Sequence, residues 1–197
     1  MPRPKADSEK VREILLVAAE RRLRQLGSPR FSVTDLAADC RMSQSNVYRF
    51  FPNKSALAAA LVERWFQEIE AELRAVIDAA DRWQTKLERF VLVQLRIKSS
   101  RFDQDPKLFR AYLMLADEHP EPVLEHVRRL QDMLNGILSA AFEGEGRDCA
   151  RMLVEDATLI FRDPVSIARL RTRCTPERAD AVIGAVRAEL ERRIVPA

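Results

Sequence analysis

Hydrophobic residues recur along the chain at the spacing of helices, and no segment alternates like a strand. The first helix is predicted over residues 8–26, before the run Gly27–Pro29 that ends it. The apolar face of this helix contains Val11, Ile14, Leu15, Ala18 and Leu26. A periodic segment with a glycine and a proline directly after it is typical of an amphipathic helix packed against a core.

Two short helices come next in the sequence. Ser32 precedes Asp35 by three residues, which is a capping pattern, and predicts a helix that continues to about Cys40. Ser43 is a second N-cap candidate, and the helix after it should span residues 44–51, before Pro52. Because helices this short are marginal alone in water, we expect both to pack against the first helix. The pattern predicts a three-helix, helix-turn-helix unit.

The rest of the chain continues the helical pattern. Asn53 is the expected cap of a helix that reaches about residue 79, and the clearest flexible connection should lie over residues 142–147. Prolines divide the remaining sequence into expected helices at 83–100, 106–117, 121–142, 147–163, 165–173 and 177–194. We therefore predict an all-α fold with a helix-turn-helix domain over 1–52 and a larger helical domain over 53–197.

The composition agrees with a helical globular protein. The chain of 197 residues is 47% hydrophobic and 32% charged, with five glycines and 7% aromatic residues. Its longest apolar run, residues 56–62, is far shorter than the roughly 20 residues that span a bilayer. Three scattered cysteines without a CxxC pair suit a reducing compartment, and the N-terminus lacks an apolar signal core. We expect a cytoplasmic protein.

Charge is distributed unevenly along the sequence. Residues 1–55 hold 11 Lys and Arg against 6 Asp and Glu, whereas the remainder holds 22 against 24. The overall charge of +3 therefore divides into +5 and −2. A basic first quarter suits contact with phosphates, although a solvated basic face has the same composition.

Motifs for catalysis are missing from the sequence. It has no GxSxG, P-loop or GxGxxG pattern, and its two histidines, His119 and His126, form no HExxH motif. Their spacing around two prolines is not a recurrent metal-ligand pattern. We expect no enzyme activity, no cofactor and no metal site.

The polar cluster Ser43–Asn46 lies where a recognition helix presents its first residues to the major groove. Glutamine and asparagine there could pair with adenine edges, although the cluster could also be only a polar helix start. The stretch from Phe31 to Ala37, together with Ser43 to Leu57, resembles the DNA-binding domain of TetR-family transcriptional regulators. The combination of Tyr48, Phe51, Pro52 and Lys54 after a helix-turn-helix is a specific part of that resemblance.

The resemblance implies roles for individual residues. Thr34, Tyr48 and Lys54 would contact phosphates, which their hydroxyl and ammonium groups can do. The residues that would approach bases or nearby backbone are Gln44, Ser45, Asn46 and Arg49, and those of a minor-groove arm are Arg3 and Lys5. Where the family usually has glycine in the turn, this chain has Arg41, whose left-handed conformation would cost about 1 kcal/mol.

The same resemblance implies a small-molecule ligand and a homodimer. Segments 84–97 and 108–115 are apolar around much of their circumference, so they either form a buried core or line a ligand cavity. The candidate wall residues are Trp65, Phe66, Phe90, Phe109, Tyr112 and Met133. The last two long helices carry apolar stripes that would close the core of a monomer or, in TetR-like proteins, pair with their twofold copies.

The expected function is thus a DNA-binding transcriptional regulator, acting as a repressor that binds a palindromic double-stranded operator as a homodimer and is released by an unknown small molecule. Two alternatives remain at this point. One is a redox-responsive regulator that acts through Cys149 or Cys174. The other is a helical interaction protein without specific DNA binding.

Overall fold

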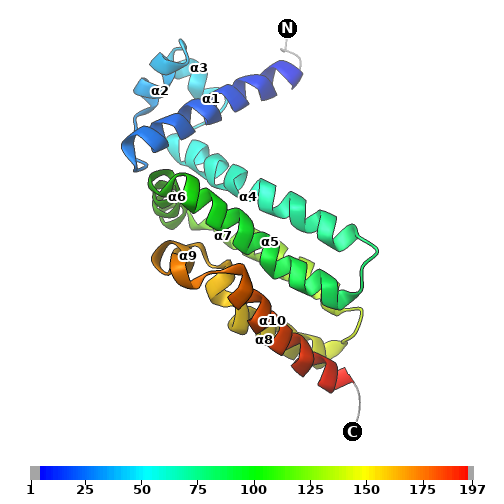
Figure 1. Cartoon of the computed structure of the whole chain (residues 1–197). Helices are drawn as coiled ribbons and strands as arrows, with labels where there is room; N and C mark the ends of the chain where they lie inside the picture. Colours follow the sequence, from blue (N-terminus) through cyan, green and yellow to red (C-terminus); the bar gives the residue numbers. More distant parts are fainter. Residues whose placement is uncertain (1–4, 195–197) are drawn as a thin grey trace. The chain divides into compact units, whose positions relative to one another are not determined.

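The computed structural model describes residues 5–194, with side chains from residue 8 onward. Every regular element in this range is helical, which confirms the predicted all-α fold (Figure 1). The elements are α1 (Lys5–Leu26), α2 (Val33–Asp39), α3 (Gln44–Tyr48), α4 (Lys54–Asp78), α5 (Trp83–Gln104), α6 (Pro106–Glu118), α7 (Pro120–Leu138), α8 (Gly144–Arg162), α9 (Pro164–Arg169), the 3-10 turn Arg171–Arg173 and α10 (Pro176–Ile194). Among the described helices, none is both long enough and apolar enough to cross a membrane.

Three predicted helix starts are capped by side chains as the sequence indicated. The Ser32 hydroxyl accepts the amide of Asp35 at 3.0 Å, and the Ser43 hydroxyl accepts the amide of Asn46 at 3.2 Å. The amide of Ala56 donates to Asn53 Oδ1 at 2.7 Å before α4. Each cap satisfies an amide that has no partner within its helix, so these boundaries are set locally.

Other predicted boundaries were wrong. The connection between α7 and α8 covers 139–143 instead of the expected 142–147, because α7 already ends at Leu138 and α8 begins at Gly144. The amide of Arg147 donates to the carbonyl of Glu143 and closes the first turn of α8. Gly144 and Gly146 therefore lie in the first turn of a helix and not in a flexible loop. Helix α3 ends at Tyr48, since the amides of Phe50 and Phe51 both turn back to the carbonyl of Val47. The helix expected over 165–173 is divided into α9 and a 3-10 turn.

The chain forms two compact units. Among the described residues, the first unit contains 5–66 and 105–125, and the second contains 67–104 and 126–194. Helices α4 and α7 therefore contribute to both units, whereas α6 lies within the first. The sequence order of the helices does not predict this division.

The core of the first unit joins α1 to the short helices. It includes Leu15, Leu23, Leu36, Val47 and Leu61, all almost completely buried. Two residues predicted on the buried face of α1 are in fact exposed: Ile14 retains 51% of its surface and Leu26 retains 48%. The neighbours of α1 cover a face centred on Leu15, Ala19 and Leu23 instead.

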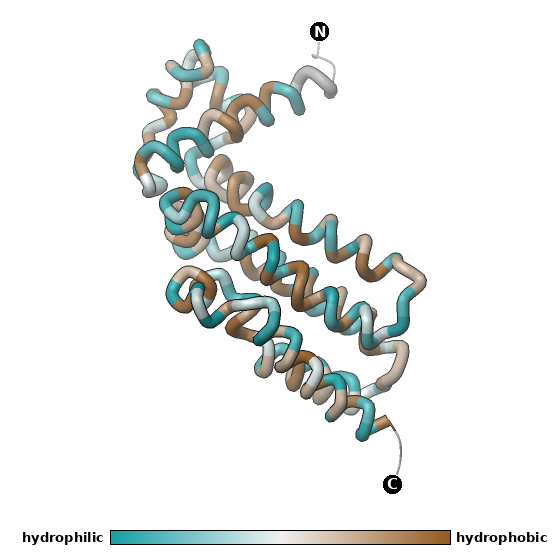
Figure 2. The backbone as a smooth tube through the Cα atoms, viewed as in Figure 1, coloured by the Kyte–Doolittle hydropathy of each residue, from teal (hydrophilic) through white to brown (hydrophobic). Residues whose placement is uncertain are grey.

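Helices α5, α8 and α10 pack on one another in the second unit, where they run side by side (Figure 1). Their buried side chains include Phe90, Val154, Phe161, Ile183 and Leu190. Along these helices apolar turns alternate with polar ones, which is the pattern of helices with one covered face (Figure 2).

Gly27 ends α1 in a conformation that other residues rarely adopt. Its φ is +70°, and its amide donates to the carbonyl of Leu23 at 2.7 Å. A Cβ at this position would lie 2.5 Å from Cε of Lys107, whose ammonium donates to the carbonyl of Gln25. A Cβ on Gly136, within α7, would have no such neighbour within 4 Å.

We therefore expect Gly27→Ala to lower the free energy of unfolding by about 1–2 kcal/mol, because it adds left-handed strain and displaces Lys107. The matched variant Gly136→Ala should raise it by about 0.5–1 kcal/mol, since alanine has the better helix propensity. Urea denaturation of both variants measures this difference. Equal effects would contradict the role given to Gly27.

Candidate nucleic-acid interface

The turn between α2 and α3 contains a non-glycine residue in the left-handed conformation. Arg41 has φ of +53°, and the amide of Met42 donates to the carbonyl of Ala37 at 2.8 Å. The amide of Cys40 donates to the carbonyl of Leu36 at 3.1 Å. Arg41 thus takes the place of the usual glycine at a cost of about 1 kcal/mol, and α2 still closes with backbone hydrogen bonds.

Two arginines of α1 hold the helix-turn-helix in place. Arg22 donates two hydrogen bonds to the carboxylate of Asp39, at 2.6 and 2.7 Å, and these bonds lower the pKa of Asp39 below its usual value. Arg12 donates to the carbonyl of Phe50 at 2.5 Å and lies 4.3 Å from the ring centroid of Phe51. The contacts of Arg22 fix the end of α2, and those of Arg12 fix the segment after α3.

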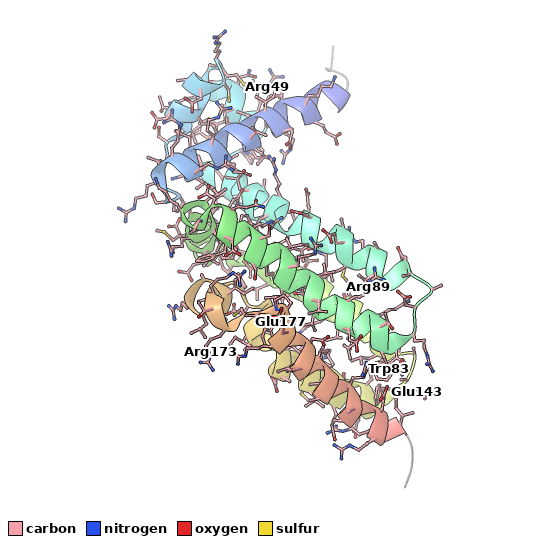
Figure 3. The ribbon with its side chains drawn as sticks, viewed as in Figure 1. Arg49, Trp83, Arg89, Glu143, Arg173 and Glu177 are labelled. Atoms are coloured by element: carbon pink, nitrogen blue, oxygen red, sulfur yellow. The ribbon has the colours of Figure 1, made fainter. Side chains whose placement is uncertain are left out.

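The described DNA-contact candidates all lie in the first unit, on α2, on α3 with its C-cap, and at the start of α4. Asn46 is half-buried, whereas the exposed residues are Thr34, Gln44, Ser45, Tyr48, Arg49 and Lys54. Arg49 follows the last residue of α3 (Figure 3). Arg3 lies outside the described residues, as does the side chain of Lys5, the first residue of α1.

Contacts among these candidates join α2 to α3. The side-chain amide of Gln44 donates to the hydroxyl of Thr34, so a base-contact candidate touches a phosphate-contact candidate. Lys54 Nζ lies 5.4 Å from the ring centroid of Phe31, which keeps the ammonium at the start of α4. Helix α3 itself, of sequence QSNVY, carries no acidic side chain. The arrangement offers polar and cationic groups to phosphates and base edges without a carboxylate on the helix between them.

Two family models match the chain. The model of "Bacterial regulatory proteins, tetR family" matches residues 15–61, and that of "Tetracyclin repressor-like, C-terminal domain" matches residues 84–183. The chain belongs to the TetR family of transcriptional regulators. As a TetR-family protein it is a DNA-binding transcriptional regulator, and members of this family are generally not enzymes. No protein with a curated description matches the sequence.

Solved structures of TetR-family regulators share the fold. A TetR-family transcriptional regulator from Mesorhizobium loti is 15% identical with a TM-score of 0.68, over 92% of this chain and 96% of that one. Another from Pectobacterium atrosepticum is 22% identical with a TM-score of 0.58, over 97% and 95%. The multidrug binding protein EbrR, complexed with imidazole, is 16% identical with a TM-score of 0.56, over 95% and 91%.

The six ligand candidates of this TetR-family chain divide between the two units. Trp65 lies 5.5 Å from Phe109 and 4.1 Å from Tyr112 between ring centroids, so the first unit brings these three together. Phe66 is buried in the same core. Phe90 and Met133 belong instead to the second unit, where Phe90 is fully buried and Met133 packs against the core. The sequence could not assign them to separate units.

The two cysteines considered for redox sensing differ in exposure. Cys149 is exposed and Cys174 is buried, both as free thiols, and burial raises the pKa of Cys174. A raised pKa makes a thiol less reactive. Within residues 5–194, no group of three or more His, Cys, Asp or Glu side chains could hold a metal ion.

Sequence reasoning missed Arg12 and Arg22, the two residues that position the recognition segment. Both counted only toward the basic charge of the first quarter. Their partners are 38 and 17 residues away, and one is a backbone carbonyl. No local pattern marks such a contact, so a single sequence holds no signal for it.

The cap of α3 leads to a stability prediction. Ser43→Ala should lower the free energy of unfolding by about 1 kcal/mol, because it removes the acceptor for the Asn46 amide. Ser45→Ala should change it by less than about 0.5 kcal/mol, since Ser45 is exposed. Thermal unfolding of the two variants compares them. If Ser45→Ala were the more destabilising, the capping assignment would be wrong.

Proposed function

We propose that this regulator is a ligand-responsive repressor, which binds a palindromic operator as a homodimer and is released from it by a small molecule. The observation that carries the DNA-binding part is the short α3, with exposed polar residues at its start and cationic residues beside it. In this proposal residues 1–52 recognise DNA and residues 53–197 regulate and dimerise. Because the partner is DNA, we place its action in the cytoplasm.

Each DNA-contact candidate keeps the role that its chemistry suits. We propose that Thr34, Tyr48 and Lys54 contact phosphates, since their polar groups are exposed around α3. The proposed base contacts are Gln44, Ser45, Asn46 and Arg49, and the proposed minor-groove arm is Arg3 and Lys5. Amides read adenine edges and guanidinium groups read guanine, so α3 and Arg49 could specify a half-site.

The proposed dimer uses the last two long helices, α8 and α10. Met152 and Leu159 lie seven residues apart on α8, on one side of the helix, and keep 49% and 57% of their surface exposed. On α10, Ile194 is 40% exposed. Large exposed apolar side chains on neighbouring helices suit a self-complementary interface. A twofold axis would also hold two recognition helices about 34–36 Å apart, as successive major grooves require.

The proposed ligand effect passes through α6. This helix carries Phe109 and Tyr112, and the Tyr112 hydroxyl donates to Glu20 of α1 at 3.1 Å. Arg24 of α1 also pairs with Asp105, the N-cap of α6, at 3.0 Å. A ligand that prefers a different position of α6 would move α1 with it, and its binding energy would be subtracted from DNA affinity. The likeness to EbrR, a multidrug binding protein by its printed name, supports a ligand site in general terms.

The phosphate contacts are tested on an operator recovered by selection from random DNA. The double variant Tyr48→Phe, Lys54→Ala should bind it at least about tenfold more weakly, because each subunit loses a hydroxyl and a cation. The slope of log affinity against log salt should fall by about two for the dimer. Arg89→Ala, which removes an exposed cation on α5, is the control and should leave both unchanged. An unchanged slope in the double variant would contradict the phosphate roles.

A substitution on α8 tests the proposed dimer interface. Leu159→Glu should convert the dimer to a monomer at micromolar concentration, because it buries a carboxylate in the proposed interface. Operator affinity should fall with it, since half-sites would then be bound singly. Leu124→Glu changes an equally exposed leucine, 60% exposed, on α7 and should leave the dimer intact. Light scattering after size exclusion measures the mass; a dimeric Leu159→Glu protein would exclude this interface.

A further inference from the structure

Two cations of the second unit, the buried Lys98 and the half-buried Arg162, have no carboxylate partner among residues 8–194. Lys98 of α5 is only 4% exposed, and its ammonium donates to the carbonyl of Arg162 at 2.5 Å and to Gln94 Oε1 at 3.4 Å. The guanidinium of Arg162 donates to the Thr158 hydroxyl at 2.8 Å and to the carbonyl of Glu155 at 3.0 Å. Neither cation forms a salt bridge with any residue of the described range 8–194. Both are satisfied only by uncharged oxygens.

The carboxylates whose charges act on Lys98 and Arg162 are those of Asp163 and Glu155, and both are engaged with other groups. Glu155 accepts a hydrogen bond from Arg151 at 2.7 Å. Asp163 accepts the amide and the hydroxyl of Ser166, at 2.7 and 2.6 Å, as the N-cap of α9. Glu70 accepts a hydrogen bond from Arg129 at 3.0 Å, and His126 Nδ1 lies 2.7 Å from the same oxygen. Lys98 and Arg162 therefore keep an excess of positive charge between α5 and the end of α8.

This excess charge is unfavourable in the unbound protein. Burial, together with the neighbouring charge of Arg162, lowers the pKa of Lys98 to about 7. Burial also lowers the pKa of Arg162. An ammonium removed from water without an anion is costly, and stability alone would favour an uncharged side chain. Buried charges that the fold does not need are candidates for ligand recognition.

The surroundings suggest what kind of anion would fit. The same helices contribute Phe90, Leu95, Val154 and Phe161 to the apolar core. An ammonium has three donors, of which two are used here, and Nη1 of Arg162 makes no hydrogen bond within the described residues. A carboxylate can accept from more than one cationic donor and carries a single charge, whereas a phosphate would bring two charges into an apolar region.

We propose that the second unit binds an organic carboxylate with an apolar body, whose carboxylate is held by Lys98 and Arg162. This inference rests on the proposed ligand-responsive function and names the chemical class of the ligand. The carboxylate supplies the missing counter-charge, and its apolar part enters the surrounding core. Binding fixes Lys98 in its charged form, so at a pH above 7 the complex takes up a proton.

Only Lys98 should change charge between pH 6 and 8. The charged groups that face it are Arg162, Arg101 and Asp163, while burial, together with nearby Lys98 and Arg129, lowers the pKa of His126 to about 3 and keeps that imidazole neutral. A group with a pKa near 7 is mostly neutral at pH 8, so proton uptake should approach one per site there and nearly vanish at pH 6. Affinity should fall about fivefold from pH 7 to pH 8.

Calorimetry on the full chain without DNA tests this, with octanoate and phenylacetate as probes and octan-1-ol and 2-phenylethanol as uncharged controls. We expect the acids to bind and the alcohols to bind at least tenfold more weakly. Titrations at pH 8 in two buffers of different ionisation enthalpy measure the proton uptake. Equal binding of acids and alcohols, or no binding of either acid, would overturn the proposal.

Variants separate a binding role from a packing role. Lys98→Met should weaken acid binding at least tenfold and abolish proton uptake, whereas Lys98→Arg should retain binding without proton uptake, since arginine is always charged. Lys86→Met is the matched control, because Lys86 is another lysine of α5 whose ammonium donates to a backbone carbonyl, that of Ile77 at 2.5 Å. Wild-type binding by Lys98→Met, or proton uptake that persists in Lys98→Arg, would contradict the assignment.

The site and the proposed repressor function can fail separately. If octanoate binds with the expected proton uptake but does not release operator DNA, the carboxylate site stands and the ligand-release mechanism is wrong. If neither acid binds while the protein still binds its operator, the site is wrong and DNA recognition stands. Operator binding by Lys98→Met also reports whether that variant is folded.

Discussion

The recognition helix is too short to be stable alone, and the rest of the first unit is arranged around that constraint. Helix α3 has five residues, whereas isolated helices are marginal below about 12–15. Its stability comes from the Ser43 cap and from Val47, which is 1% exposed in the core. Arg12 holds the segment directly after it. The position of α3 and of the segment after it therefore depends on α1.

Helix α1 is held on two sides within the first unit. Arg12 and Arg22 join it to the helix-turn-helix, while Glu20 and Arg24 join it to α6 and its cap. Residues 105–125 lie within the C-terminal family match, yet they pack in the same unit as the DNA-binding helices. A change in α6 can reach α3 through one helix, without a long chain of intermediate contacts.

Features set by residues close together in the sequence were predictable, whereas features set by tertiary packing were not. The caps at Ser32, Ser43 and Asn53 were predictable because a capping side chain and its amide are three residues apart. The exposure of Ile14 was not, since helical spacing defines a face but not which neighbours cover it. The same limit applies to the ligand candidates: apolar residues at helical spacing indicate burial, while their assignment to two units depends on tertiary packing. Arg41 was predictable only because a glycine was expected there.

Lys98 shows where sequence reasoning stops and why that matters for function. A lysine in an amphipathic helix is expected on the solvent face, because its charge is costly to bury. The structure instead surrounds it with α5 and α8, where apolar packing would be served by an uncharged side chain of similar length. Its hydrogen bond to the last carbonyl of α8 is favourable at a helix C-terminus, but water or a neutral donor would satisfy that carbonyl too. The charge itself is thus not required for the fold, and an anion that arrives with a ligand is the partner that would make it favourable.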